Sequence, residues 1–180
     1  ARSPANVVVN ATAAGAGDGM ATLHTPQRDH GQASLKTHDT GSWSAGAAVR
    51  SSEIAVTRLD TYVAAQRPAR IDVVKMDVEG AELGVLRGSL QLLAASRPVV
   101  MFESGPADAA GLGYTKPGMW QFLAGQGYQL LLPHRLAHDG EALGLEGFID
   151  SHTYPRRTTN YFAVPAERRI EIRDRARALL

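Results

Sequence analysis

Short apolar runs recur along the chain between glycines, prolines and polar residues, and their length and content of β-branched residues are typical of strands. The runs predicted to be strands are residues 6–13, 20–25, 54–59, 71–78, 99–103, 128–132 and 160–165. A helical face of leucines predicts a helix over residues 79–96, and its members are Leu83, Leu86, Leu90 and Leu93. Because strands alternate with helices, we expect an α/β fold, a three-layer sandwich with a mostly parallel sheet.

The remaining helices and loops follow from capping residues and composition. Asp60 is placed to cap a short helix that runs through Val63. Residues 117–126 predict a further helix, and a charged helix is expected after the last strand. Residues 26–52 and 104–118 read as loops, and we expect them to shape the pocket for a substrate.

Length and charge exclude several classes of protein. The 180 residues are the usual size of one domain, so residues 1–180 are expected to form a single domain. The 19 basic and 18 acidic residues leave a net charge of +1, which provides no field for recruiting nucleic acid. No apolar run is long enough to cross a bilayer and no signal peptide is recognised, so we expect a soluble, cytoplasmic protein. The absence of cysteine excludes disulfides, a cysteine nucleophile and thiolate metal ligands.

Acidic residues stand at the ends of two successive predicted strands. Asp77 follows one strand and Glu103 ends the next, at the sheet edge where open α/β folds bind ligands. Lys75 lies within the first strand, on the same face as Asp77. A buried ammonium group needs an acidic partner, and Asp77 or Glu103 would serve, whereas a lysine on an edge strand would simply reach water.

The stretch around these residues resembles the FkbM family of S-adenosylmethionine-dependent methyltransferases. The resemblance rests on the pair Leu59–Asp60, on residues 74–82, which read VKMDVEGAE, and on a following strand that ends in glutamate. It implies a class I methyltransferase fold, S-adenosylmethionine as cofactor, and O-methylation of a sugar, glycolipid or polyketide-like acceptor. Under this resemblance Asp77 and Val78 would approach the cofactor. Asp77, Glu79 or Glu103 would orient or deprotonate the acceptor hydroxyl, and Lys75 would hold the carboxylates.

The glycine-rich cofactor loop of the family has one candidate here, Gly15–Gly19. No acidic residue precedes it and a strand follows it, so we assign it to a hairpin turn. Asn10 and Ala11 would then be the contacts of this region with the cofactor. Since the chain has no initiator Met and enters a strand at once, we expect the first strands of the fold to be missing. The alternative is a catalytically silent binding module.

Three histidines form another group of candidates, His134, His138 and His152. A His-x₃-His pair near Asp139 would suit zinc if it were helical, but Pro133 and Gly140 bracket the segment. We therefore predict surface histidines in a loop and no metal. A metal-dependent enzyme using Asp77, Glu103 and histidines remains the second alternative. The charged tail predicts a solvated helix or a contact between copies of the chain, as in a homo-oligomer.

Overall fold

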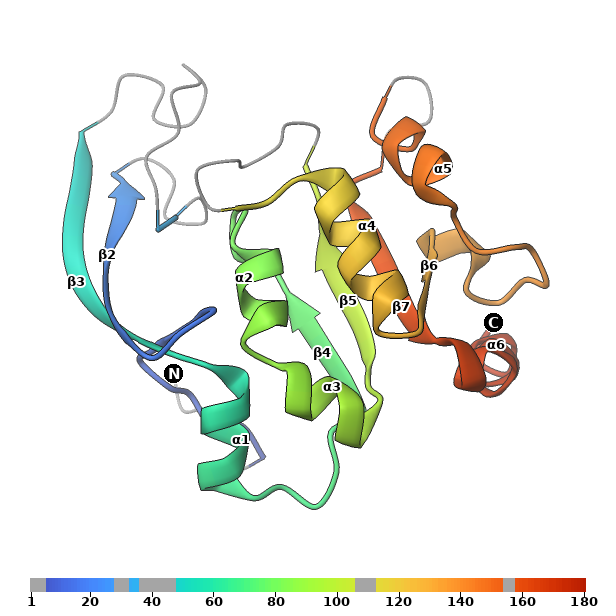
Figure 1. Ribbon diagram of the computed structural model, residues 1–180, viewed down its shortest axis with the longest axis horizontal. Coiled ribbons are helices and arrows are strands. Elements are labelled where there is room, and N and C mark those ends of the chain that lie inside the picture. The colour runs from blue at the N-terminus through green and yellow to red at the C-terminus, as the bar shows by residue number, and fades with distance from the viewer. Residues whose placement is uncertain (1–5, 28–32, 36–47, 106–112, 154–157) are drawn as a thin grey trace.

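The computed structural model describes residues 6–27, 33–35, 48–105, 113–153 and 158–180. Within these ranges the chain forms two β-sheets and six α-helices (Figure 1). The expected α/β class is therefore confirmed. In the described part of the chain, no helix combines the length and the hydropathy needed to cross a bilayer.

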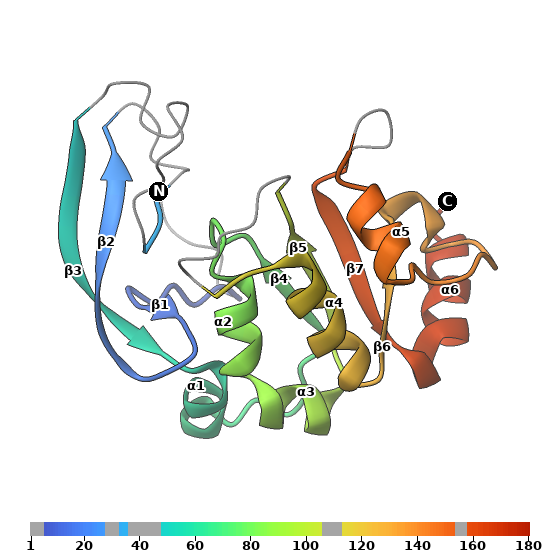
Figure 2. The ribbon, with the colours of Figure 1, turned by 45° about the horizontal axis from the view of Figure 1, so that its top comes forward.

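The first sheet contains β1 (Ala13–Ala14), β2 (Gly19–Pro26) and β3 (Val49–Thr57), in the order β1-β3-β2. β1 runs parallel to β3, and β2 runs antiparallel to it. The β2–β3 pair, called the ribbon below, is long and stands beside the helical body of the molecule (Figure 2). On its other edge β2 makes a single bridge from His24 to Ser34.

The second sheet contains β4 (Val73–Met76), β5 (Val99–Glu103), β6 (Tyr128–Leu131) and β7 (Asn160–Pro165). Its order is β4-β5-β7-β6, with β4 parallel to β5 and the other two pairs antiparallel. The expectation of a mostly parallel sheet is therefore wrong for the described residues. The helical crossover after β4 makes the next strand parallel, whereas β7 inserts between β5 and β6 in the opposite direction.

Helices cover both faces of the second sheet, but unevenly. They are α1 (Leu59–Gln66), α2 (Glu82–Arg87), α3 (Leu90–Ser96), α4 (Lys116–Gly125), α5 (Leu145–Asp150) and α6 (Arg169–Arg177), with 3₁₀ turns at Pro133–Arg135 and Ala166–Arg168. The main core lies between one face of the second sheet and the helices α2 to α5. Its buried members include Val100, Phe102, Leu130, Leu83, Met119 and Phe148. On the opposite face Val99, Leu131 and Val164 form a smaller cluster against Ile172 of α6. The expected three-layer sandwich is thus only partly present among the described residues.

Two of the expected elements differ from the structure. Residues 6–12 form no strand, and Val7, Val8 and Val9 are 47%, 78% and 77% exposed. The β-branched run does favour an extended chain, but a strand also needs hydrogen-bonding partners, and no described strand pairs with it. The helix expected over residues 79–96 is two helices, because α2 ends at Gly88 and α3 starts after Ser89.

A close contact between two glycines explains that break. Gly15 follows β1, and its carbonyl oxygen packs directly on Gly88, where an added Cβ would lie only 2.1 Å from it. Glycine is required at such an approach because any side chain would displace the backbone. This contact joins the first sheet to the junction of α2 and α3.

We expect Gly88→Ala to lower the free energy of unfolding by about 1–3 kcal/mol, since the new methyl group would overlap backbone that cannot move cheaply. Gly84→Ala is the matched control in the same helix, because the nearest atom to its Cβ would be 3.9 Å away. That variant should be unchanged or more stable by about 0.5–1 kcal/mol, from helix propensity. Urea denaturation of both variants measures the difference, and equal stabilities would contradict the proposed contact.

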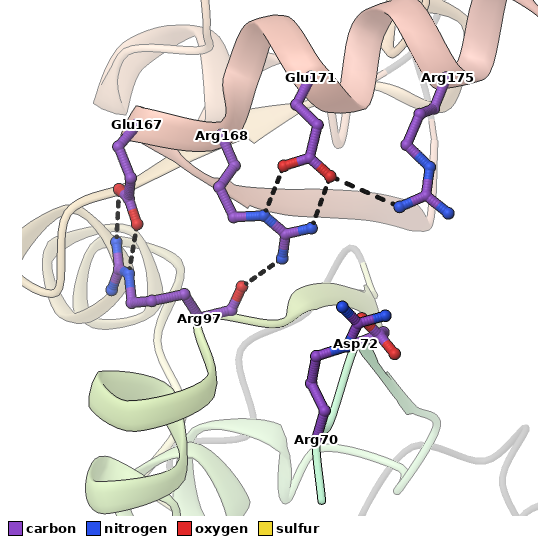
Figure 3. A network of polar contacts seen from close by, with 7 residues as sticks. All are labelled: Arg70, Asp72, Arg97, Glu167, Arg168, Glu171 and Arg175. Atoms are coloured by element: carbon purple, nitrogen blue, oxygen red, sulfur yellow. Dashed lines mark hydrogen bonds and ion pairs between the residues drawn. The ribbon is translucent and has the colours of Figure 1, made fainter.

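A cluster of polar contacts attaches the segment that leads into α6 to the end of α3 (Figure 3). Arg97, at the end of α3, makes a two-pronged ion pair with Glu167 at 2.7 and 3.0 Å and also donates to the Gln126 carbonyl at 2.8 Å. Arg168 donates in turn to the Arg97 carbonyl at 2.8 Å. The hydrogen bond from Arg97 lowers the pKa of Glu167 to about 2. One arginine therefore ties together the α3–β5 corner, the α4–β6 turn and the start of α6.

Candidate active site

The carboxyl ends of β4 and β5 bring two acidic side chains together. Met76 lies opposite Phe102 in this parallel pair, so Asp77 and Glu103 occupy the next positions at the same sheet edge. The sequence pattern predicts this position for both residues. This edge is where open α/β sheets bind their ligands.

Lys75 holds Asp77 from the same strand face. Its Nζ donates to Asp77 Oδ2 at 2.8 Å, and the two side chains are 51% and 48% exposed. The pairing with an acidic residue is confirmed, and of the two alternatives for Lys75 the structure has the exposed lysine on an edge strand, because β4 forms the edge of its sheet in the described part of the chain. An exposed pair contributes about 0–1 kcal/mol to stability, so its main effect is to orient the Asp77 carboxylate.

Glu103 has a raised affinity for a proton. Burial raises the pKa of its carboxyl, and the charge and hydrogen bonding of Asp77 raise it further, while the Lys75 ammonium acts in the opposite direction. Two close carboxylates resist being ionised together, so the negative charge of Asp77 favours the protonated form of Glu103. A carboxyl of this kind is suited to accept and release a proton during a reaction.

The turn after β4 has a strained backbone that is held from two sides. Glu79 adopts a left-handed φ of 49° and Gly80 follows at 96°. Glu82, which is buried at the start of α2, accepts hydrogen bonds from the amides of Val78 and Gly80 at 3.4 and 3.3 Å. Ser34 donates its hydroxyl to the Glu79 carbonyl at 3.2 Å. A left-handed non-glycine residue costs on the order of 1 kcal/mol and persists only where such contacts impose it.

A cavity of about 250 Å³ opens beside Asp77, between the first sheet and the start of α2. Its lining consists mostly of small or apolar side chains, and it includes Thr12, Ala13, Ala14, Leu23, Val78 and Ala81. A carboxylate at the edge of an apolar wall suits a cationic sulfonium or ammonium group. The volume is below the roughly 300–1,000 Å³ of pockets that enclose a whole drug-sized ligand. The residues present therefore fit the methyl-bearing end of S-adenosylmethionine.

The two other residues expected to contact the cofactor lie outside this cavity. Asn10 lines an adjoining cavity of about 140 Å³, together with Thr12 and Leu59, and its amide donates to the Tyr62 hydroxyl at 2.9 Å. Ala11 is exposed and lines neither cavity. Of the four residues named for the cofactor, Asp77 and Val78 thus line the cavity between the first sheet and α2.

The glycine segment 15–19 packs against the protein itself. It links β1 to β2, but β3 lies between those strands, so the expected hairpin turn is wrong. Gly15 contacts Gly88 and the Val56 side chain. The Asp18 carboxylate accepts hydrogen bonds from the Arg58 amide at 2.8 Å and the Thr61 hydroxyl at 2.8 Å, and these contacts lower its pKa. The segment therefore serves to attach α1 to the first sheet.

A buried polar network lies directly behind Glu103. The next residue, Ser104, shares hydrogen bonds with the Tyr114 hydroxyl and, at 2.6 Å, with His152 Nε2. His152 Nδ1 lies 2.7 Å from the Phe148 carbonyl, an acceptor, so this nitrogen carries a proton. His152 is only 6% exposed, and the prediction of a surface histidine is wrong for it. The network holds the end of β5, and with it Glu103, to α5.

The other two histidines follow β6, which lies at the opposite end of the second sheet from β4 and Asp77. His134 belongs to the 3₁₀ turn Pro133–Arg135, and His138 lies in the exposed segment that follows. No three histidine, aspartate or glutamate side chains gather around a common point in the ranges that the structure describes. The geometry of these residues therefore gives no support to the metal-enzyme alternative.

Sequence reasoning missed two residues that shape the site. Glu82 lies four residues after Val78, in the first turn of α2. A glutamate at this position can accept hydrogen bonds from the amides of the preceding turn, and this spacing could have identified it. Ser34 lies in a polar loop without periodicity and gave no signal. Most of the loops expected to hold the acceptor, namely residues 28–32, 36–47 and 106–112, lie outside the described residues.

A comparison with protein families matches most of the chain. A family model described as the methyltransferase FkbM domain matches residues 2–130, which include the ribbon, the ends of β4 and β5, and helices α1–α4. Comparisons with curated proteins and with solved structures found no match.

Proposed function

The chain belongs to the FkbM methyltransferase family, and we propose that it transfers a methyl group from S-adenosylmethionine to a hydroxyl of a sugar, glycolipid or polyketide-like acceptor. The observation that carries this proposal is the pair of carboxylates at the ends of β4 and β5, Asp77 and Glu103, of which Asp77 lines a small apolar cavity. Such a pair can bind a hydroxyl and take its proton, whereas no thiolate or metal chemistry is needed.

S-Adenosylmethionine supplies an electrophilic methyl group when it is bound. Asp77 and Val78 would line its methyl-bearing end, and the strained turn at Glu79 keeps the backbone beside the cavity. Glu103 would accept the proton of the acceptor hydroxyl as its oxygen takes the methyl group, whose bond to sulfur would break to leave S-adenosylhomocysteine. The raised pKa of Glu103 suits it to this role, because it brings the carboxyl closer to the pH of the reaction. Lys75 donates to Asp77 and would thereby orient its carboxylate toward the acceptor. Alignment of the hydroxyl with the methyl group provides much of the acceleration.

Titration calorimetry with S-adenosylhomocysteine tests the cofactor site of this chain. We expect micromolar binding that is lost in Asp77→Ala, because the carboxylate at the cavity edge is removed. Asp72→Ala is the matched control, since Asp72 precedes the same strand, pairs with Arg70 on the exposed surface and lies away from the cavity. Its affinity should stay within about twofold of the unaltered chain. A folded chain that binds no S-adenosylhomocysteine would contradict the proposal and favour a silent binding module.

A further inference from the structure

The ribbon has two chemically different faces. Leu23 lies opposite Ser52, and Thr25 lies opposite Arg50, so these residues share one face of the antiparallel pair. Leu23 also lines the cavity beside Asp77. We call this side of the ribbon the inner face, because it looks onto the candidate active site.

A second cavity on the inner face, of about 360 Å³, lies farther along the ribbon. Its lining residues are Thr25, Gln27, Arg50 and Ser52. Thr25 lies two residues beyond Leu23, or about 7 Å at roughly 3.4 Å per residue. The inner face therefore has an apolar residue, Leu23, near Asp77 and polar residues farther along the ribbon.

The polar side chains of the inner face are available for a ligand, unlike those of the outer face. On the outer face Thr22 donates to Glu53 at 2.6 Å, and His24 Nδ1 lies 2.9 Å from the Ser51 hydroxyl. In contrast, the four side chains of the second cavity make no hydrogen bond or ion pair with any other described residue. One of them, Arg50, carries a full positive charge.

Building on the methyltransferase function proposed above, we propose that this second cavity binds an anionic group, a carboxylate or a phosphate, on a remote part of the acceptor. The guanidinium of Arg50 matches the geometry of either anion through paired hydrogen bonds. The hydroxyls of Thr25 and Ser52 and the amide of Gln27 would bind neighbouring hydroxyls of the acceptor. The acceptor is then an acidic, elongated polyol such as an anionic sugar, which reaches from Glu103 to the outer part of the ribbon.

Amide chemical shifts of the ¹⁵N-labelled chain test this site without any need for turnover. The probes are glucose 6-phosphate, glucuronate, neutral glucose and inorganic phosphate, each titrated at constant ionic strength. We expect both charged sugars to shift the amides of the four lining residues and to bind at least about tenfold more tightly than glucose. The relative affinities of the two charged sugars identify which anion the site prefers.

Two neighbouring serines provide a matched pair of variants. Ser52→Asp places a carboxylate on the inner face beside Arg50 and should weaken binding of the charged sugars by about tenfold or more. Ser51→Asp makes the same change on the outer face and should leave binding within about twofold. Equal effects of the two variants, or shifts elsewhere on the chain, would overturn the proposal. Inorganic phosphate that binds as tightly as glucose 6-phosphate would also overturn it, since the site would then hold an adventitious ion only.

The two proposals fail in different ways. Loss of S-adenosylhomocysteine binding with intact binding of charged sugars would contradict the methyltransferase function alone. Normal cofactor binding with no shift at the second cavity would overturn the acceptor site alone. The dispersed amide spectrum of each variant confirms in the same experiment that it is folded.

Discussion

Replacing Glu103 with Gln is expected to slow methyl transfer by about 10²–10⁴-fold, the usual contribution of a general base. Gln preserves the size of the side chain but cannot take a proton from the acceptor hydroxyl. Transfer of a labelled methyl group to an acceptor sugar at saturating cofactor measures the rate. Glu146→Gln is the control, because this glutamate is exposed on α5 away from the carboxylate pair, and it should keep full activity.

The raised pKa of Glu103 predicts how the rate of methyl transfer depends on pH. Burial and Asp77 raise the pKa of Glu103, so its ionised form, which is the base, appears only above the ordinary glutamate range. The rate should therefore fall as the pH drops through this raised pKa. Asp77→Asn removes the neighbouring negative charge, so the pKa of Glu103 should fall in this variant. Carbon-13 NMR of the Glu103 carboxyl measures the shift directly, and a pKa that rises in this variant would contradict the assignment.

Replacing Asp60 with Ala is expected to lower the free energy of unfolding by about 2–4 kcal/mol, the largest effect on stability that we predict. Asp60 was expected to cap its own helix, but it lies inside α1 and caps α3 instead. Its carboxylate accepts hydrogen bonds from the amides of Gln91 and Leu92 at 3.1 and 2.9 Å, and from Arg58 at 3.1 Å. The side chain is 4% exposed, so water cannot replace the lost acceptor.

Urea denaturation provides the measurement for this prediction. Asp60→Asn keeps one carbonyl oxygen as an acceptor and should lose about half as much stability as the alanine variant. Asp150→Ala is the control for removing an aspartate, because Asp150 is exposed at the end of α5. An Asp60→Ala variant as stable as this control would show that the capping contacts contribute nothing. Since domains are stable by only about 5–15 kcal/mol, a loss of the expected size is readily measured.

The inner face of the ribbon illustrates how a site can escape prediction. Thr25 ends a predicted strand, whereas Arg50 and Ser52 belong to residues 26–52, which the sequence predicts to be a polar loop. Their common face depends on the register of β2 against β3, which brings together residues about 25 positions apart in the chain. A single sequence contains no signal for such a register, because each strand alone fixes only which of its own residues alternate.

The sequence by itself determined the local features of this protein. Periodicity located β4, β5 and the helical leucines between them, and alternation within one strand placed Lys75 beside Asp77. The motif around Asp77 was sufficient to identify the family. These features depend on residues that are close together in the chain, where backbone geometry alone sets which side chains meet.

The tertiary structure decided the features that depend on distant partners. It set the antiparallel position of β7, the edge position of β4, and the break at Gly88 under the Gly15 carbonyl. It also buried His152 behind Glu103 and directed Asp60 to a helix about 30 residues away. The physical reason is that burial, capping and strand order are set by the packing of segments that are far apart in the chain. The local pattern of apolar residues does not indicate which of these segments will pack together.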